Sequence, residues 1–333
     1  MGKLASLHPI LEHAVQAARK GAKHRAPRVV LSLAVLSVLA ASCVTFGAPS
    51  SRLPIVHKDP NEVVIASFDF PESVLLAELY AQALEAHDYP VRRMINLGSR
   101  ETVDPALFQG HVDLVPEYLG TALAFSTLGE SASASNKKFM VDWLSTELRS
   151  LGVTVTEPAE AQNRNEIVVT KETAERLELV EISDLRDKAE RLTFGGPPEC
   201  PARDLCLVGL ERRYGIDFER FLSLDAGGPA TLNALLVGEI DVALLFSTDP
   251  NIVEHDLVLL EDDRKLQPPE NVVPIIRSEV IARYGSGLTN AIEEVTRLLS
   301  TSDLRILNRA VELEGRSPAG VATQWLTTQE LIE

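Results

Sequence analysis

Two thirteen-residue stretches, ALFQGHVDLVPEY at residues 106–118 and ALLVGEIDVALLF at residues 234–246, share one pattern. Each holds an apolar segment that ends in glycine, then an aspartate, then a short apolar run that closes on an aromatic ring, Tyr118 or Phe246. A helix that ends at glycine before a buried strand is the usual local pattern of α/β proteins. The repeat therefore predicts two similar α/β lobes. It leaves open whether the two rings also share a function.

The sequence around the repeat supports this interpretation. EVVIASF predicts a strand, and the helical segment after it has Asp69 as a candidate N-cap. DPALFQG predicts a short helix capped by Asp104. A second strand and helix series begins at EIVVT, and two amphipathic segments near the C-terminus favour a return to the first lobe. We expect lobe I at residues 62–162 plus 265–333, lobe II at 163–264, and a mainly parallel sheet in each.

The N-terminal segment has a different character. Residues 1–42 carry six bases against the single acid Glu12 and end in the uncharged run VVLSLAVLSVLAAS, which is typical of a secretory signal peptide. The run stops at Cys43, and LAASC resembles the lipobox of bacterial lipoproteins, with Ala40 where leucine is usual. We expect lipidation of Cys43 and a tether at residues 43–61. Ordinary signal-peptidase cleavage nearby is the alternative.

Charge and cysteine content limit the function further. Removal of the leader changes the formal net charge from −16 to −21, because the leader carries six bases and one acid. Such an acidic chain should repel nucleic acid and anionic lipid headgroups. Two cysteines remain after the leader and Cys43, Cys200 and Cys206 within GGPPECPARDLC. An exported protein favours a disulfide between them, and two unpaired thiols are the alternative.

The sequence contains no recognisable catalytic or metal-binding constellation. The four histidines beyond the leader are scattered, YGSGL lacks the spacing of a nucleophile elbow, and the Gly-Gly pair at Gly195 lacks the residues of a phosphate-binding loop. We therefore expect a binding protein without metal or cofactor. A secreted hydrolase on the same lobes is the enzyme alternative.

Residues 62–331 resemble one family, the substrate-binding proteins of osmoprotectant ABC importers of the glycine betaine, choline and ProX type. The resemblance depends on several motifs that occur in order: ASFDFPESVLLAELYAQALEA, INLGSRE, DLVPEYLGTAL, FGGPPE, YGIDF, DAGG, ALLVGEIDV, FSTD and QPPENVVP. It implies a type II periplasmic-binding-protein fold, in which two crossover strands form a hinge between two α/β lobes that close on a small solute.

The resemblance also implies a binding site. Tyr118 and Thr121 match ligand-contacting positions in EYLGT, Phe246 matches the aromatic residue before Ser-Thr-Asp, and Arg203 matches an arginine that holds the ligand carboxylate. At the other site positions the chain departs from the family. After Ser67, Phe68 stands where the family has a cationic residue. Asn165 and Glu270 stand where the family has aromatic residues.

These departures bear on the solute. An aromatic cage attracts a quaternary ammonium group through cation–π interaction, worth up to about 2 kcal/mol for a desolvated ring. Asn165 and Glu270 would instead bond ammonium protons, which a methylated nitrogen lacks. The first expectation is a betaine-like or choline-like solute, and an amine-bearing solute is the alternative.

The implied partners are the solute and the permease and ATPase subunits of an importer. We expect a monomer on the outer face of the cell membrane, held there by lipidated Cys43 and in contact with no nucleic acid. A sensor or adhesion lipoprotein that kept the fold without transport is the remaining alternative.

Overall fold

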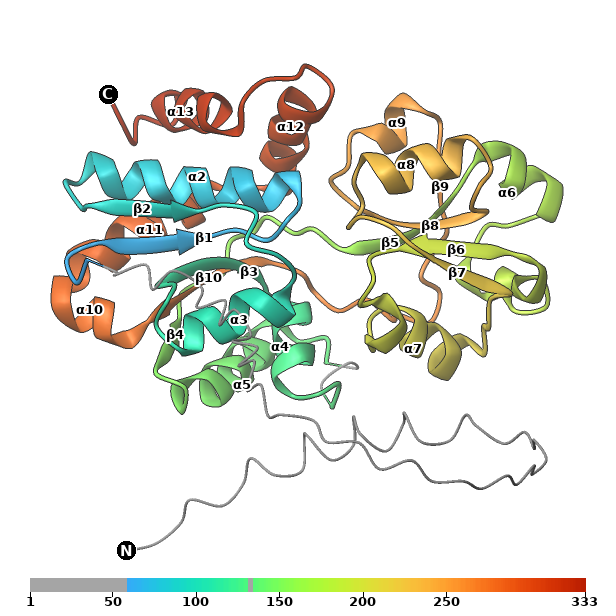
Figure 1. Cartoon of the computed structure of the whole chain (residues 1–333), viewed down its shortest axis with the longest axis horizontal. Coiled ribbons are helices and arrows are strands. Elements are labelled where there is room, and N and C mark those ends of the chain that lie inside the picture. The colour runs from blue at the N-terminus through green and yellow to red at the C-terminus, as the bar shows by residue number, and fades with distance from the viewer. Residues whose placement is uncertain (1–58, 131–133) are drawn as a thin grey trace, which may run out of the picture. The chain divides into compact units, whose positions relative to one another are not determined.

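The computed structural model describes residues 59–130 and 134–333. Within them the chain forms two five-stranded sheets, each covered by helices on both faces (Figure 1). The predicted signal peptide, Cys43 and nearly all of the predicted tether lie outside the described residues. No helix of the described part is both long enough and apolar enough to cross a membrane.

The sheet of lobe I has the order β2-β1-β3-β10-β4. Its strands are β1 (Val63–Ala66), β2 (Val91–Met94), β3 (Leu114–Tyr118), β4 (Val153–Val155) and β10 (Val272–Arg277). On one face pack α2 (Pro71–Ala86), α11 (Ser286–Leu298), α12 (Thr301–Glu312) and α13 (Pro318–Thr328). On the other face pack α3 (Arg100–Phe108), α4 (Leu119–Ser126) and α5 (Lys137–Arg149). The helix α10 (Ser278–Tyr284) follows β10 directly, so the C-terminal segment returns to lobe I as expected.

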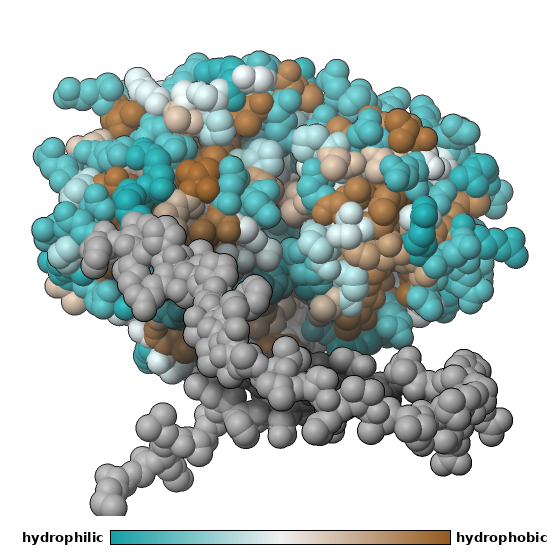
Figure 2. Space-filling model, viewed as in Figure 1, coloured by the Kyte–Doolittle hydropathy of each residue, from teal (hydrophilic) through white to brown (hydrophobic). Residues whose placement is uncertain are grey.

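The sheet of lobe II has the order β7-β6-β8-β5-β9. Its strands are β5 (Asn165–Val169), β6 (Thr193–Gly196), β7 (Arg220–Ser223), β8 (Val242–Phe246) and β9 (Val258–Leu259). One face is covered by α8 (Pro229–Leu236) and α9 (Asn251–Glu254). The other is covered by α6 (Lys171–Leu177), α7 (Leu207–Gly209) and four short helical segments, Ile182–Leu185, Ala189–Arg191, Cys200–Ala202 and Leu210–Tyr214. Figure 2 shows polar side chains over much of the visible surface, with apolar ones in separate patches.

Both sheets are mixed, which corrects the expectation of mainly parallel sheets. In lobe I, β1 pairs in parallel with β2 and β3, whereas β10 is antiparallel to β3 and to β4. Lobe II repeats this arrangement, with β5 antiparallel to β8 and to β9. The chain crosses between the lobes twice. The first strand after each crossing, β5 or β10, is antiparallel to the central strand beside it, β8 or β3.

The two crossings run next to each other. The first lies between β4 and β5 and the second between β9 and β10, and they are joined by an antiparallel bridge between Gln162 and Asn271. Main-chain bonds continue on both sides of that bridge, from Asn163 N to Glu270 O and from Val272 N to Ala161 O. The lobe limits at 162/163 and 264/265 fall in these crossings and stay our proposed boundaries.

The repeated stretch has the same structure in both lobes. Gly110 and Gly238 follow their helices with φ of +79° and +75°, a conformation that glycine adopts without strain. The aspartate that follows accepts a bond from the neighbouring parallel strand: Val64 N donates to Asp113 Oδ2 and Thr193 N to Asp241 Oδ2, both at 2.9 Å. In each lobe the aspartate thus provides an acceptor for a main-chain N–H group near the start of the neighbouring parallel strand.

Two helix starts differ from the prediction. Helix α3 begins at Arg100 after the extended Ser99, so Asp104 is an interior residue and Pro105 lies within the helix. Thr102 N and Val103 N already donate to Ser99 O, and a proline removes only one later main-chain bond. Helix α2 begins at Pro71 with Phe70 as its N-cap residue, so Asp69 is not the cap.

Candidate functional site

A cavity lies where the carboxyl ends of β1 and β3 in lobe I approach β8 of lobe II. Open α/β sheets bind ligands at such edges. Its lining includes four aromatic rings, a disulfide loop and several polar or charged side chains: Phe68, Phe70, Tyr118, Phe246, Asp69, Ser99, Arg100, Thr121, Asn163, Asn165, Glu199, Cys200, Arg203 and Cys206. Six of the eight predicted ligand-binding residues are in this set, and the other two, Ser67 and Glu270, are buried behind it.

The four rings form one group. Phe70 contacts Tyr118 at a centroid distance of 6.0 Å, Phe246 at 5.1 Å, and Phe68 at 6.1 Å with nearly parallel planes. Phe246 comes from lobe II, and the other three come from lobe I, so Phe70 connects the rings of the two lobes. Sequence reasoning missed Phe70, although its alternation with Phe68 after a buried strand was the available signal.

The guanidinium of Arg100 lies over the ring of Phe68. It lies 4.8 Å from the Phe68 ring centroid and makes two bonds to Glu117, of 2.7 and 2.6 Å. Both side chains are almost fully buried, and Glu117 also accepts a bond from Tyr118 N. Asp104 lies in the same network, where burial and the charge of Glu117 raise the pKa of its carboxyl well above the usual value. Arg100 is therefore a cavity residue that the sequence interpretation did not include.

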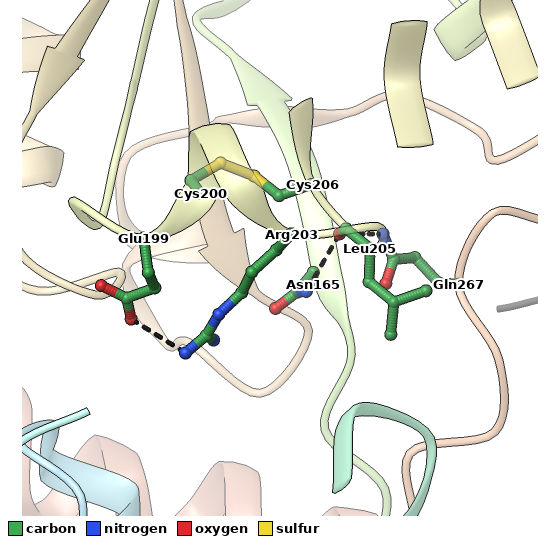
Figure 3. The surroundings of a disulfide bond; sticks show 7 residues. All are labelled: Asn165, Glu199, Cys200, Arg203, Leu205, Cys206 and Gln267. Carbon is green, nitrogen blue, oxygen red and sulfur yellow. Dashed lines mark hydrogen bonds and ion pairs between the residues drawn. A yellow bond between two sulfur atoms is a disulfide. The ribbon is translucent and has the colours of Figure 1, made fainter. Parts of the chain in front are cut away.

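Arg203 comes from the loop closed by the disulfide between Cys200 and Cys206, whose Cα atoms are 5.3 Å apart (Figure 3). Its Nη2 makes ion pairs with Glu199 at 3.3 Å and with Glu101 of lobe I at 2.9 Å. Burial alone raises the pKa of Glu101, but bonds from Ser99 and Arg203 outweigh it and the pKa is lowered. Arg203 Nε is buried without a partner in the described residues, so this donor is available to a ligand.

Thr121 and Glu270 form a pair at the start of α4. Thr121 donates its main-chain N–H to Glu270 Oε2 at 3.0 Å and its hydroxyl to Glu270 Oε1. Glu270 is 1% exposed, and Gly120 makes room for it, because a Cβ at Gly120 would lie 3.0 Å from the Glu270 carboxyl carbon. Burial raises the pKa of Glu270 to about 7, against the bonds from Thr121 that lower it.

Ser67 and Asn165 have structural partners. Ser67 is fully buried, and its Oγ accepts a bond from Asn96 N at 2.8 Å, so it fixes the chain after β1. Asn165 pairs with Phe246 across β5 and β8, and its side-chain amide lies 3.4 Å from Leu205 O in the disulfide loop (Figure 3). Ser67 thus lies behind the cavity, whereas Asn165 forms part of its wall.

Glu72 connects the parts around the cavity. Its Oε1 accepts bonds from Tyr118 Oη and Asn163 Nδ2, both 2.7 Å, and its Oε2 accepts bonds from Thr248 Oγ1 and Asn308 Nδ2, both 2.6 Å. The donors belong to β3, the first crossing, lobe II and α12, and Glu72 is 3% exposed. Burial raises the pKa of nearby Glu312 to about 8, with Asp249 and Glu72 adding to the effect. Sequence reasoning gave no signal for this carboxylate.

The donor set offers no evident metal site. Within residues 59–130 and 134–333, no group of three or more histidine, cysteine, aspartate or glutamate side chains has the arrangement of a metal centre. The cavity combines aromatic faces, one partly paired arginine and hydrogen-bonding side chains. Such a combination can enclose a small polar solute that has an apolar or cationic part.

A two-lobed α/β fold with a polar and aromatic cavity between the lobes is the architecture of solute-binding proteins. The family model for the substrate binding domain of ABC-type glycine betaine transport systems matches residues 61–328. The chain therefore belongs to this family, and it is a substrate-binding protein of an ABC importer that captures a small solute outside the cytoplasm.

Individual relatives agree with this assignment. The glycine betaine-binding protein YehZ of Escherichia coli is 29% identical, with 88% of this chain and 97% of that protein covered. The ergothioneine transport permease/ergothioneine binding protein EgtU of Helicobacter pylori is 25% identical over 90% of this chain, which spans 52% of that protein. A crystal structure of a glycine betaine/carnitine/choline ABC transporter protein is 27% identical, with a TM-score of 0.61, and 81% of this chain and all of that chain are covered. The expected two-lobed periplasmic-binding-protein fold is confirmed.

Proposed function

We propose that this protein captures a small zwitterion with a methylated ammonium group, of the glycine betaine or carnitine kind, and delivers it to a permease. The observation that carries the proposal is the group of four rings, Phe68, Phe70, Tyr118 and Phe246, at one cavity with Arg203. Ring faces attract a methylated cation, and an arginine donor pairs with a carboxylate. The names of the relatives, which include glycine betaine, carnitine and choline, support the same solute class.

The solute class is tested by thermal unfolding and calorimetry with a panel of compounds. The panel contains glycine betaine, carnitine, choline and ergothioneine, together with a polyamine and standard amino acids for the amine-bearing alternative. A ligand that binds only the native state raises the unfolding midpoint by mass action. A midpoint shift with the polyamine alone would contradict the proposal, and chemical change of a bound solute, followed by NMR, would favour the hydrolase alternative.

We expect Tyr118→Ala and Phe246→Ala each to weaken binding of the identified solute by about 1 to 3 kcal/mol, because each removes a ring that lines the cavity. Tyr118→Phe separates the ring from its hydroxyl, which bonds Glu72. Phe139→Ala is the matched control, since Phe139 is 56% exposed and does not line the cavity. Calorimetry that gave wild-type affinity for both alanine variants would show that the repeated stretch serves the fold alone.

We further propose that the protein is a monomer held at the outer face of the membrane by lipidated Cys43, with the permease and ATPase subunits as partners and no nucleic acid. Two acyl chains suffice for stable anchoring, whereas one is marginal. Mass spectrometry of the membrane-extracted protein should find a modified cysteine, Cys43, at the N-terminus. A soluble product that begins at another residue would contradict the anchor. A permease gene next to this one would argue against the sensor alternative.

A further inference from the structure

The pair formed by Thr121 and Glu270 bears on which chemical groups the cavity accepts. Thr121 lines the cavity, and its hydroxyl proton is directed to the buried Glu270 Oε1. A hydroxyl has one proton and two lone pairs. While that proton is given to Glu270, Thr121 offers the solute lone pairs only, and these repel a carboxylate.

One proton on Glu270 reverses this arrangement. If Oε1 of Glu270 carries a hydrogen, it donates to Thr121 Oγ1, while Oε2 still accepts from Thr121 N. The Thr121 hydroxyl proton is then free to turn toward the cavity. The same side chain becomes a donor, which a solute carboxylate accepts.

We propose that Glu270 is a positioning residue that sets the hydrogen-bond polarity of Thr121, so that a carboxylate-bearing solute binds together with one proton taken up from solvent by Glu270. This inference rests on the proposed function, because it concerns how that site distinguishes a carboxylate from a hydroxyl. A solute such as choline, which has a hydroxyl and no carboxylate, requires no such proton.

The surroundings of Glu270 make this exchange accessible near neutral pH. Burial raises the pKa of Glu270 to about 7, the bonds from Thr121 and the charge of Arg100 of α3 lower it, and the charge of Glu117 of β3 raises it. Asp104 is buried near Arg100, and its charge favours the charged form of the Arg100 guanidinium. Because Arg100 is already paired with Glu117 through two bonds, it does not fully compensate a charge on Glu270.

The test is the pH dependence of affinity, measured by calorimetry for glycine betaine and for choline. Neither compound changes its own charge between pH 6 and 8.5. The protonated fraction of a group of pKa about 7 falls about 30-fold over that range, so glycine betaine affinity should fall by about that factor. Choline affinity should change less than about threefold. Calorimetry in buffers of different ionisation enthalpy should show uptake of about one proton with glycine betaine at pH 8.

Glu270→Gln is the decisive variant, because its amide donates to Thr121 Oγ1 permanently and its oxygen still accepts from Thr121 N. It should bind glycine betaine with the wild-type affinity of pH 6 and no pH dependence. Thr121→Val should lower the affinity for glycine betaine at pH 6 by about tenfold, whereas Thr121→Ser should leave that affinity unchanged.

A ligand-free control uses thermal unfolding. Since the native pKa of Glu270 exceeds its ordinary value of 4.5, wild type should lose stability relative to Glu270→Gln as pH rises toward about 7 and not beyond. Glycine betaine affinity that is independent of pH in wild type, or an unchanged pH profile in Glu270→Gln, would overturn the inference and leave the proposed function intact. If none of the methylated solutes binds at any pH, the proposed function fails and the inference fails with it.

Discussion

Glu72→Ala is expected to lower the free energy of unfolding by about 3 to 5 kcal/mol. The substitution removes a buried carboxylate that accepts four bonds of 2.6 to 2.7 Å, from Tyr118, Asn163, Thr248 and Asn308. Each buried donor left without an acceptor costs about 1 to 3 kcal/mol, and water entering the space recovers part of it. Urea unfolding followed by circular dichroism measures the loss.

Glu85→Ala is the matched control on the same helix. Glu85 pairs with Arg93 at 2.6 Å, but its side chain is 41% exposed, and exposed pairs contribute less than about 1 kcal/mol. Single removal of donors, Thr248→Val or Asn308→Ala, should each cost about 1 kcal/mol. If Glu72→Ala were no more destabilising than Glu85→Ala, Glu72 would not be the connecting group that its contacts indicate.

Arg100→Met should be of similar severity, with a loss of about 3 to 5 kcal/mol, because it leaves Glu117 charged and buried without its partner. Glu117 is 0% and Arg100 6% exposed, so solvent does not replace the lost interaction. The thioether chain of methionine keeps most of the volume against Phe68 and isolates the effect of charge.

The double variant Arg100→Met with Glu117→Gln provides the test of that cause. Glutamine keeps an oxygen that accepts from Tyr118 N, as Glu117 does at 2.9 Å, but carries no charge. The double variant should therefore recover at least half of the stability lost by Arg100→Met. Additive losses in urea unfolding would mean that packing, and not the unpaired charge, causes the effect.

The repeated stretch shows how far the sequence alone reached. Its glycine, aspartate and apolar run predicted two similar lobes, and the structure assigns the aspartates Asp113 and Asp241 one common role beside a central strand. The place of Tyr118 and Phe246 in a ligand site was instead implied by the family resemblance, and both rings line the cavity. The prediction of two similar lobes depends on local pattern and needs no long-range information.

Other parts of the site were beyond such reasoning. Glu72 and Asn308 are 236 positions apart, and nothing in their neighbouring sequence indicates that one side chain bonds the other. A helix that starts at the predicted cap Asp104 would leave Arg100 outside it, whereas α3 begins four residues earlier, at Arg100. The resemblance predicts an aromatic ring at the position of Glu270, and it gives no sign of the bonds to Thr121, which depend on how the second crossing packs on α4.

The ion pair between Arg203 and Glu101 makes one contact between the lobes sensitive to the salt concentration outside the cell. Glu101 is 44% exposed, so dissolved ions reach the pair, and an exposed ion pair contributes less as the salt concentration rises. A rise in salt concentration therefore weakens this contact between the lobes. The bonds of Glu72, which is 3% exposed, are shielded from those ions, so the connection that Glu72 makes between lobe I and Thr248 of lobe II persists at high salt.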